Sequence, residues 1–176
     1  MDLFDAIAAR HSYRGAFTAA TVPRGDLLKI VQAGIQAPSA KNEQVVSFVI
    51  VDRLETVKQI AAIIGRPPCD TAQAMIACVV DPRPVLEDIS FCIEDCAACV
   101  ENLLLAVTAL GYATVWIDGA LRREKRAQRV AELLGVPDNK RVQVLLPIGV
   151  PAERVAQKEK LPLSHRAWWN RYGAKQ

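Results

Sequence analysis

The length, composition and charge of the chain restrict what it can be. Its 176 residues are 51% hydrophobic and 23% charged, with a net charge of +3 and a pI near 8.7. These values suit one globular domain and exclude a fibrous, disordered or disulfide-packed protein. The mild positive charge favours small anionic ligands but is far from the dense basic surface of a nucleic-acid binder. We therefore expect a single domain over residues 1–176 with no nucleic-acid partner.

The first residues and the longest apolar run indicate a cytoplasmic protein. The segment MDLFDAIAARHSYRG has an acid at position 2 and no long apolar run, so it does not resemble a secretory signal. The run 103–117 is broken by Gly111 and is shorter than the roughly 20 residues of a membrane-spanning helix. We expect no membrane partner. In a reducing cytoplasm the five cysteines are expected to be free thiols.

Apolar periodicity predicts helices and strands in alternation. An arm of irregular, basic and aromatic sequence is expected over 152–176, and no dinucleotide-binding or P-loop glycine motif follows any strand. Strands are expected over 45–51 and 74–80, both buried, and over 113–118 and 141–149. Helices are expected over 3–9 with Asp2 as N-cap, from Pro23 until Pro38 stops the helix, and over 54–64, 87–110 and 121–134.

The longest predicted helix contains three cysteines in a stretch of eight residues. At about 100° per residue, Cys92, Cys96 and Cys99 share one stripe with leucines, and Glu94, Glu101 and Thr108 lie on the opposite side. A structural zinc takes four ligands, and one helix supplies three at most. We therefore expect core packing, with thiols that are buried, unbridged and metal-free. Metal binding or redox work is the alternative.

Four segments carry polar groups suited to chemistry. RHSYR (10–14) supplies two guanidinium forks and a hydroxyl, which suit a phosphate. APSAKNEQ (37–44) is a polar turn that can present backbone groups and an amide. LGYATVWIDG (110–119) ends in a glycine that would let a flat ligand approach the backbone. PIGVP is followed by Lys158 and Lys160. Each segment alone would also suit a solvated helix end or an ordinary loop.

In this order and spacing, and with the tail WWNRYG, the four segments resemble the FMN-dependent nitroreductase family, above all its short, single-domain members. The resemblance spans Arg10 to Lys160. It implies an α+β fold of three layers, in which helices flank a mixed, mainly antiparallel central sheet and a long central helix lies at the dimer interface. It also implies a homodimer with two FMN sites between the subunits, with the arm 152–176 wrapping the partner.

The resemblance also implies roles for residues. No side chain is implied to be catalytic, because hydride would enter at flavin N5 from NADH or NADPH and leave to a nitroaromatic, a quinone or a similar small electron-poor acceptor. The FMN phosphate and ribityl chain would be held by Arg10, His11, Ser12, Arg14, Lys158 and Lys160. The isoalloxazine would meet Pro38, Ser39, Ala40 and Asn42, expected from the other subunit. Its N5 and O4 edge would meet backbone groups of Ile117, Asp118 and Gly119.

Two departures from the family pattern stand out. Gln44 is followed by two valines where family members often have Pro-Trp. The segment GRPPCD (65–70) lacks the Asn and Lys that larger members place near the flavin pyrimidine, and Gly65 and Pro68 cannot replace them. A cation there would stabilise the anionic reduced flavin. Lys41 is the candidate replacement, with an ordinary surface lysine as the alternative.

Other functions remain open from the sequence. One is a specialised flavin enzyme of the same fold, similar to a dehalogenase. Another is a non-catalytic or redox-sensing flavin-binding protein, with Cys69 or the helix thiols as the sensor. The basic run 122–129 shares its predicted helix with Glu124 and Glu132, which indicates a solvated face and not a nucleic-acid site.

Overall fold

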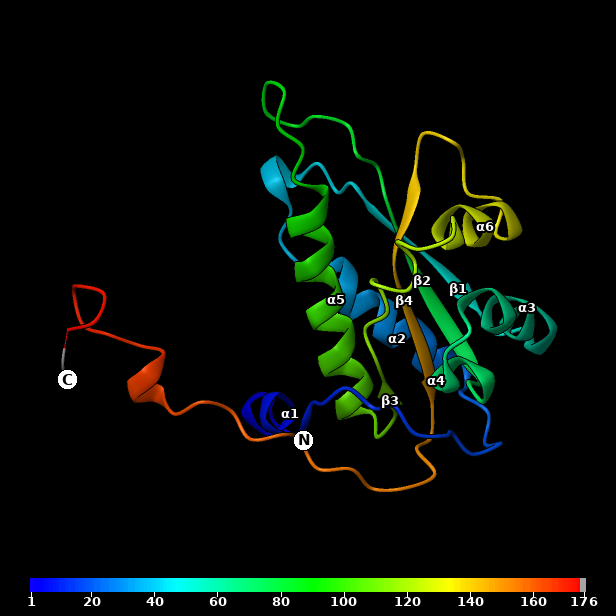
Figure 1. Cartoon of the computed structure of the whole chain (residues 1–176), viewed down its shortest axis with the longest axis horizontal. Coiled ribbons are helices and arrows are strands. Elements are labelled where there is room, and N and C mark those ends of the chain that lie inside the picture. Colours follow the sequence, from blue (N-terminus) through cyan, green and yellow to red (C-terminus); the bar gives the residue numbers. More distant parts are fainter. Residues whose placement is uncertain (175–176) are drawn as a thin grey trace.

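The computed structural model describes residues 1–174, and its elements follow the predicted order (Figure 1). Three short helices, α4, η1 and η2, were not predicted. The elements are α1 (Leu3–Ala9), α2 (Arg24–Ile35), η1 (Ala40–Asn42), β1 (Val46–Val51), α3 (Leu54–Ile64), α4 (Pro67–Asp70), β2 (Ala74–Val80), α5 (Cys92–Ala109), β3 (Ala113–Thr114), α6 (Arg126–Leu133), β4 (Arg141–Gly149) and η2 (Leu163–His165).

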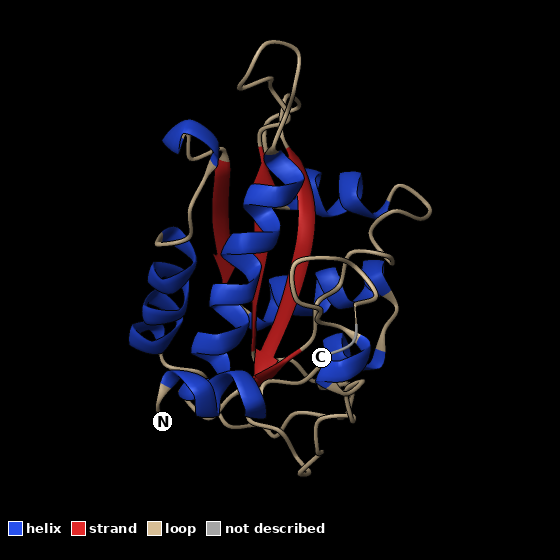
Figure 2. Ribbon diagram, turned by 90° about the vertical axis from the view of Figure 1, so that its left-hand side faces the viewer, coloured by secondary structure: helices blue, strands red, loops and turns tan. Residues whose placement is uncertain are grey.

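The sheet has the strand order β1-β2-β4-β3, and all of its pairings among the described residues are antiparallel. Alternate residues of β2 point to opposite faces because successive side chains of a strand alternate. Met75 and Ala77 join the core under α3, α4 and α6, whereas Ile76 and Cys78 join the core under α2 and α5. Figure 2 shows α5 lying across one face of the sheet, with helices on the other face as well. This three-layer arrangement confirms the predicted α+β fold class.

Helices α2 and α5 cross closely because a glycine lies at their contact. A Cβ added to Gly34 would lie 2.8 Å from Leu103 Cδ2 and 3.2 Å from Phe48 Cζ. The Asn102 side-chain amide donates a hydrogen bond to the Ala33 carbonyl across the same contact, at 3.0 Å. The core on this face of the sheet is therefore closely packed, and a side chain at position 34 would require the Leu103 side chain to shift.

Two helices are shorter than predicted because residues with left-handed backbone precede them. Glu87 has φ 52°, and the backbone of Val85 and Ile89 forms a turn, so α5 begins at Cys92 and not at residue 87. Glu124 and Lys125 have φ of 51° and 53°, so α6 begins at Arg126 and not at residue 121. The sequence predicted that the basic run 122–129 lies on one helix, but its first residues precede α6.

Two strands also differ from the prediction. Strand β1 is an edge strand paired only with β2, so its burial is partial and Ser47 is exposed, although both faces were expected to be buried. Strand β3 is confined to two residues where six were predicted. Beyond it, Ile117 alone pairs with Leu145, through backbone hydrogen bonds of 3.1 and 2.9 Å. The chain between these points turns away from β4 and becomes the wall of a pocket.

Helix α1 is capped as predicted, with the Asp2 carboxylate accepting from the Asp5 amide at 2.9 Å. Its apolar side chains are nevertheless exposed: Leu3 at 61%, Phe4 at 80% and Ile7 at 47%. Only Ala6 of this helix is buried. The chain itself thus leaves an apolar helix face uncovered.

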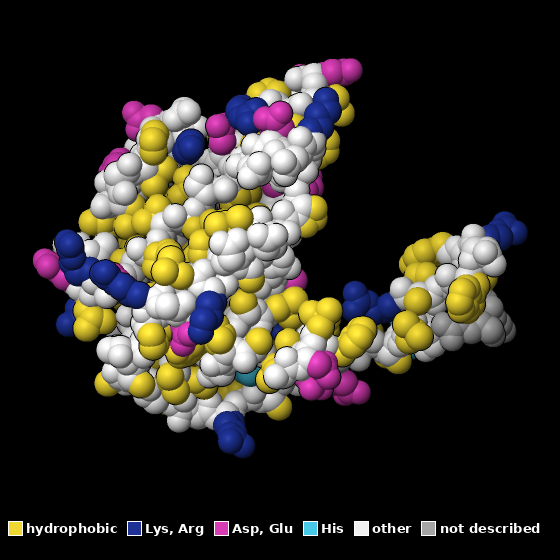
Figure 3. All heavy atoms as spheres, turned by 180° about the vertical axis from the view of Figure 1, so that it is seen from behind, with side chains coloured by type: hydrophobic (Ala, Val, Ile, Leu, Met, Phe, Trp, Pro, Cys, Tyr) yellow, Lys and Arg dark blue, Asp and Glu magenta, His cyan; other side chains and the backbone are white. Residues whose placement is uncertain are grey.

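Residues after Pro151 leave the body as an extended arm (Figure 1). In the space-filling view the arm projects from the body and carries apolar side chains (Figure 3), and these include exposed Leu161, Leu163, Trp169 and Tyr172. The last two residues of the predicted arm, 175 and 176, lie outside the described residues. Within 1–174, no helix has the length and apolar character needed to cross a membrane.

Candidate functional site

A buried tyrosine fixes the segment that follows α1. Tyr13 is fully buried, and its hydroxyl donates to the Ala16 carbonyl and accepts from the Ala152 amide, at 2.5 and 3.2 Å. Its own amide donates to the Thr114 carbonyl at 2.9 Å. Through its side chain and its backbone amide, Tyr13 therefore joins the N-terminal segment, β3 and the start of the arm.

Two glycines allow these segments to approach one another. A Cβ on Gly149 would lie 2.8 Å from Phe17 Cβ, and a Cβ on Gly15 would lie 2.7 Å from the Tyr13 hydroxyl. Phe17 forms an isolated bridge with Pro151. This close packing aligns residues 10–18 with the beginning of the arm, and a pocket forms between them.

We call this hollow of about 490 Å³ the basic pocket. It gathers every phosphate-binding residue predicted from the N-terminal segment and the arm. Arg10 is held by Glu101 at 3.3 Å, and the His11 Nδ1 donates to the Ala9 carbonyl at 2.9 Å. The pocket is lined by Arg10, His11, Ser12, Arg14, Gly15, Glu153, Val155, Ala156, Gln157, Lys158 and Lys160.

A second hollow of about 480 Å³, the turn pocket, adjoins the basic pocket because Arg14 lines both. It gathers the predicted turn Ile117–Gly119 with the first residues of α4. Its walls combine apolar side chains with guanidinium groups. The pocket is lined by Arg14, Arg66, Pro67, Pro68, Val115, Trp116, Ile117, Asp118, Gly119, Ala120 and Arg123.

The charges around the turn pocket are unevenly paired. Asp118 accepts from Arg122 at 2.9 Å, and Glu124 accepts from Arg126 at 2.9 Å. Among residues 1–174, neither Arg66 nor Arg123 has a carboxylate within 4.0 Å. The nearby acids are thus engaged, and the pocket keeps an excess of positive charge.

Sequence reasoning missed the contribution of the segment 65–70. We expected this segment to lack a cation, because its glycine and prolines cannot supply one. In the structure Arg66, directly before α4, lines the turn pocket beside Pro67 and Pro68. The adjacent Pro-Pro pair was the available signal, because proline at the start of a helix fixes the chain direction and hence the position of the residue before it.

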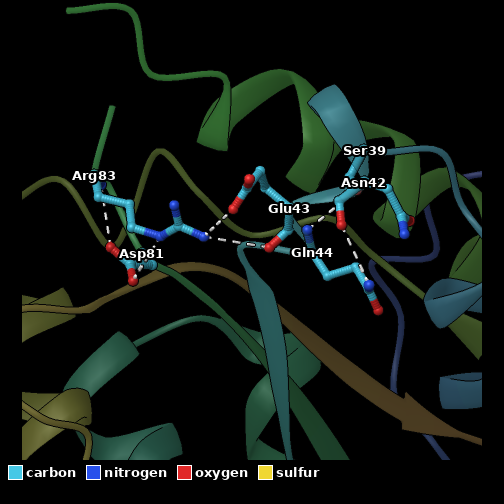
Figure 4. A network of polar contacts seen from close by, with 6 residues as sticks. All are labelled: Ser39, Asn42, Glu43, Gln44, Asp81 and Arg83. Carbon is cyan, nitrogen blue, oxygen red and sulfur yellow. Dashed lines mark hydrogen bonds and ion pairs between the residues drawn. The ribbon is translucent and has the colours of Figure 1, made fainter. Parts of the chain in front are cut away.

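The predicted segment Pro38–Asn42 lies elsewhere, at the opposite end of the sheet from α1 (Figure 1), and lines neither pocket. Figure 4 shows how this turn is held. The Ser39 hydroxyl accepts a hydrogen bond from the backbone amide of Gln44 at 3.2 Å. Arg83 donates to Glu43 Oε2 at 2.7 Å and also contacts Asp81. One chain therefore does not bring all predicted site residues together.

The backbone of this turn is strained. Lys41, Asn42 and Gln44 have φ of 50°, 57° and 50°, in the left-handed region that costs roughly 1–2 kcal/mol per residue. The buried carboxylate of Asp95 supports the turn by accepting from the Ala40 amide at 3.0 Å. Such strain concentrates at ligand clamps and active sites. Lys41 itself is exposed, and its role as a flavin cation stays a prediction.

The cysteines are confirmed as buried: Cys92, Cys96 and Cys99 are 3%, 1% and 7% exposed, and all five cysteines of the chain are free. Cys92 and Cys96 pack against the sheet in the same core cluster as Cys78. Burial raises the pKa of Cys69 to about 12, and burial with the nearby Cys96 raises the pKa of Cys99 to about 11. With these raised pKa values Cys69 and Cys99 are weak nucleophiles at neutral pH, whereas a side-chain hydrogen bond with Cys78 lowers the pKa of the buried Cys96.

Comparison with known proteins adds to this geometry. The sequence model of the Nitroreductase family matches residues 7–81 and 70–150. A protein of Archaeoglobus fulgidus, provisionally named NADH dehydrogenase/NAD(P)H nitroreductase, is 35% identical over 130 residues, which are 73% of this chain and 74% of the relative.

Solved structures agree with the sequence match. A protein of Bacteroides thetaiotaomicron with the same provisional name superimposes with a TM-score of 0.85 at 26% identity, over 97% of this chain and 98% of the other. A nitroreductase of Bacteroides fragilis with bound FMN superimposes with a TM-score of 0.78 at 25% identity, over 96% and 98%. Because the family model covers most of the sequence and the fold agrees along almost its whole length, this chain belongs to the nitroreductase family.

Proposed function

We propose that this protein is an FMN-dependent NAD(P)H oxidoreductase that reduces a small electron-poor acceptor, such as a nitroaromatic compound or a quinone. The observation that carries the proposal is the shared residue Arg14, which joins a basic pocket to a pocket with apolar walls. A flavin mononucleotide has the same two parts, an anionic phosphate and a flat, largely apolar ring. The relative with bound FMN supports this match.

The residues present fit the cofactor. In the basic pocket, Ser12 offers a hydroxyl, and Arg14, Lys158 and Lys160 offer positive charges for a phosphate, against the single carboxylate of Glu153. In the turn pocket, a Cβ added to Gly119 would meet no protein atom within 4 Å. The glycine is therefore not required by the packing of the protein, and it leaves free space beside the backbone for a ring.

The chemistry follows from this division of roles. FMN, when bound, supplies two-electron hydride chemistry at its N5 atom. The protein binds and orients: Arg14 fixes the junction between phosphate and ring, and Pro67 and Pro68 form a rigid wall. The ion pair of Asp118 with Arg122 holds the turn whose backbone faces the ring. No side chain is required to act as an acid or a base.

We further propose that the protein is a homodimer and that Pro38–Asn42 of one subunit completes the turn pocket of the other. Three features support this. The turn is strained yet held in place, as expected of a ligand clamp. Helix α1 and the arm expose apolar side chains that a second copy would cover. The side-chain amide of Asn42 makes no hydrogen bond within residues 1–174, so it is free for a ligand.

The function is tested by colour and turnover. The purified protein should be yellow or become yellow with FMN, bind FMN in a one-to-one ratio with the chain, and oxidise NADH or NADPH rapidly when a quinone or nitroaromatic is added. A colourless protein that does not bind FMN would contradict the proposal. Binding without turnover would instead support a flavin-binding protein that is not an enzyme.

The composite site is tested by mixing subunits. Arg14→Gln damages the pocket, and the double variant Ser39→Ala/Asn42→Ala damages the turn. If the turn acts across the interface, a mixed dimer holds one intact site, so refolding the two inactive variants together should restore part of the activity. If pocket and turn act within one chain, no mixture holds an intact site, and activity stays absent.

The redox-sensing alternative has less support. A sensing thiol is accessible and has a low pKa. Cys69 is fully buried, and its pKa is raised to about 12. Thiol modification of the folded protein is therefore expected to be slow, whatever the state of the flavin.

A further inference from the structure

The turn pocket carries two arginines that are not assigned to the phosphate of the cofactor. Arg66 enters it from the residue before α4, and Arg123 enters from the loop before α6. The acids nearest in sequence to Arg123 are already paired, Asp118 with Arg122 and Glu124 with Arg126. Arg129 also has no carboxylate within 4.0 Å, but it lies on the exposed side of α6, outside this pocket. What distinguishes Arg66 and Arg123 is that two unpaired cations meet at one hollow.

Like charges that face one pocket raise each other's energy unless an anion lies between them. Under the proposed function, on which this inference rests, the phosphate of FMN is assigned to the basic pocket. Arg66 lies in the segment 65–70, where a cation would stabilise the anionic reduced flavin, but the oxidised ring carries no charge to balance either Arg66 or Arg123. Their charge therefore indicates a second, anionic ligand.

The second ligand must enter the same pocket. Hydride exchange requires the two reacting atoms to come within roughly 3–3.5 Å of each other, so a substrate of the flavin lies against its ring. Substituents of that substrate then reach the pocket rim. A guanidinium can pair two oxygens of a carboxylate, sulfonate or phosphate at once, which selects such groups over neutral ones.

We propose that Arg66 and Arg123 bind an anionic group of the molecule that exchanges hydride with the flavin. That group is either a phosphate of the nicotinamide dinucleotide or an acidic substituent of the electron acceptor. Both are oxyanions, and both would be recognised by the same guanidinium pair. The protein thereby prefers charged substrates to neutral ones of equal reactivity.

The test compares matched charged and neutral substrates with the holoprotein. The reductants are NADPH, NADH and the uncharged N-benzyl-dihydronicotinamide, each with a neutral naphthoquinone as acceptor. The acceptors are naphthoquinone and naphthoquinone sulfonate, each with the uncharged reductant. The variants are Arg66→Gln, Arg123→Gln and their combination, with Arg129→Gln as a control that removes one charge from the same basic run.

The readout is the ratio of kcat/KM for the charged substrate to kcat/KM for its neutral counterpart. We expect the ratio to fall about five- to tenfold for each arginine removed and about thirtyfold or more for the double variant. Arg129→Gln should leave it within about twofold. A fall confined to the reductants places the anion on the nicotinamide dinucleotide, and a fall confined to the acceptors places it on the acceptor.

A binding measurement guards against variants that lose activity for other reasons. The dissociation constants of NADP⁺ and of naphthoquinone sulfonate for the oxidised holoprotein are measured by calorimetry, and one of them should rise by the same factor as the kinetic ratio. Arg66→Lys keeps the charge without the two-oxygen pairing, so it should recover part of the lost affinity.

Two negative results have different meanings. If the wild type binds FMN and turns over but the double variant changes neither ratio nor either dissociation constant by more than about twofold, the anion site is wrong and the proposed function stands. If the wild type binds no FMN, the proposed function fails and the anion site fails with it.

Discussion

The thiol cluster of α5 and the arginines of the turn pocket are the two chemically conspicuous regions of this protein, and they differ in what surrounds them. Cys92 and Cys96 are enclosed by core side chains, and Cys99 beside them is only 7% exposed. Arg66 and Arg123 stand at an open hollow without an acidic partner in the described chain. The thiols are satisfied by packing, whereas the arginines lack a counter-charge.

The difference shows that the kind of residue is a weaker guide to function than whether its bonding capacity is used. A buried thiol behaves as a small apolar group, so a cluster of thiols in the core needs no ligand. A guanidinium carries a full charge and five donors whatever its surroundings, so an unpaired pair of them at a pocket does call for one. Four predictions test this difference between the thiols and the arginines.

The largest effect is expected at Arg14, which joins the two pockets. Arg14→Gln removes charge-assisted hydrogen bonds worth roughly 1.5–3 kcal/mol, so the dissociation constant of FMN should rise about ten- to a hundredfold. The melting temperature of the apoprotein should change little, because Arg14 is exposed and its side chain makes only a 3.5 Å hydrogen bond to the Ser12 carbonyl. Flavin fluorescence titration measures the first quantity and calorimetry the second. Equal FMN affinity in both proteins would remove the basis of the proposed site.

The opposite pattern is expected in the thiol cluster. Cys96→Ser places a hydroxyl in the core, which costs roughly 1–3 kcal/mol and lowers the melting temperature by about 2–4 °C per kcal/mol. FMN affinity should stay within about twofold. Cys96→Ala adds no polar atom and should cost less than Cys96→Ser. If Cys96→Ala were far more damaging, and the loss were accompanied by loss of a bound metal, the packing explanation would be wrong.

A smaller effect is expected from pH. Burial raises the pKa of Cys69 to about 12 from an ordinary value near 9, so above pH 9 the unfolded chain loses this proton before the folded chain does. The free energy of unfolding should therefore be unaffected below pH 9 and should fall between about pH 9 and 12, by up to about 1.4 kcal/mol per pH unit for this group. The free energy of unfolding is measured by urea denaturation at a series of pH values. Above pH 9 it should fall more steeply with pH in the wild type than in Cys69→Ala. If the free energy of unfolding fell equally with pH in both proteins, the pKa of Cys69 would not be higher in the folded chain than in the unfolded one.

The smallest effect is expected at an arginine whose charge is already balanced. Arg83 pairs with Glu43 and Asp81 on the surface (Figure 4), and solvent screens such pairs so that they contribute little to stability. Arg83→Gln should therefore leave the melting temperature almost unchanged and should not change the kinetic preference for charged substrates. A change in that preference as large as the one expected for Arg66 would show that pairing does not separate functional from structural arginines.

Local patterns were sufficient for much of the fold. The bounds of α3, β2 and β4 agree with the predictions to the residue, because each is a short, strongly apolar segment between clear helix or strand breakers. The start of α5 and the length of β3 were wrong, because left-handed residues and a chain turning away from its neighbour leave no periodic signal. Helix α1 was found with its cap, but the exposure of its apolar face could not be foreseen from spacing alone.

The candidate site divides in the same way. The grouping of Arg10, Ser12 and Arg14 with Lys158 and Lys160 was foreseen from a resemblance to a family, although these residues are far apart in the sequence. Arg66 and Arg123 were missed because neither belongs to a motif: Arg66 is positioned by the start of α4, and Arg123 by the left-handed residues that precede α6. The separation of Pro38–Asn42 from both pockets is a feature of the assembled sheet.

The sequence by itself determined the order of helices and strands, the family and the inward face of the thiol helix, because these depend on periodicity and on residues close in the chain. Which charged side chains lie close together depends on the tertiary structure. Packing at Gly15 and Gly149 brings the N-terminal segment against the arm, and the chain after β3 and the start of α4 bring Arg123 and Arg66 to the same hollow. The sequence gives the charged residues, but whether each has a partner depends on distances that are set only when the chain folds.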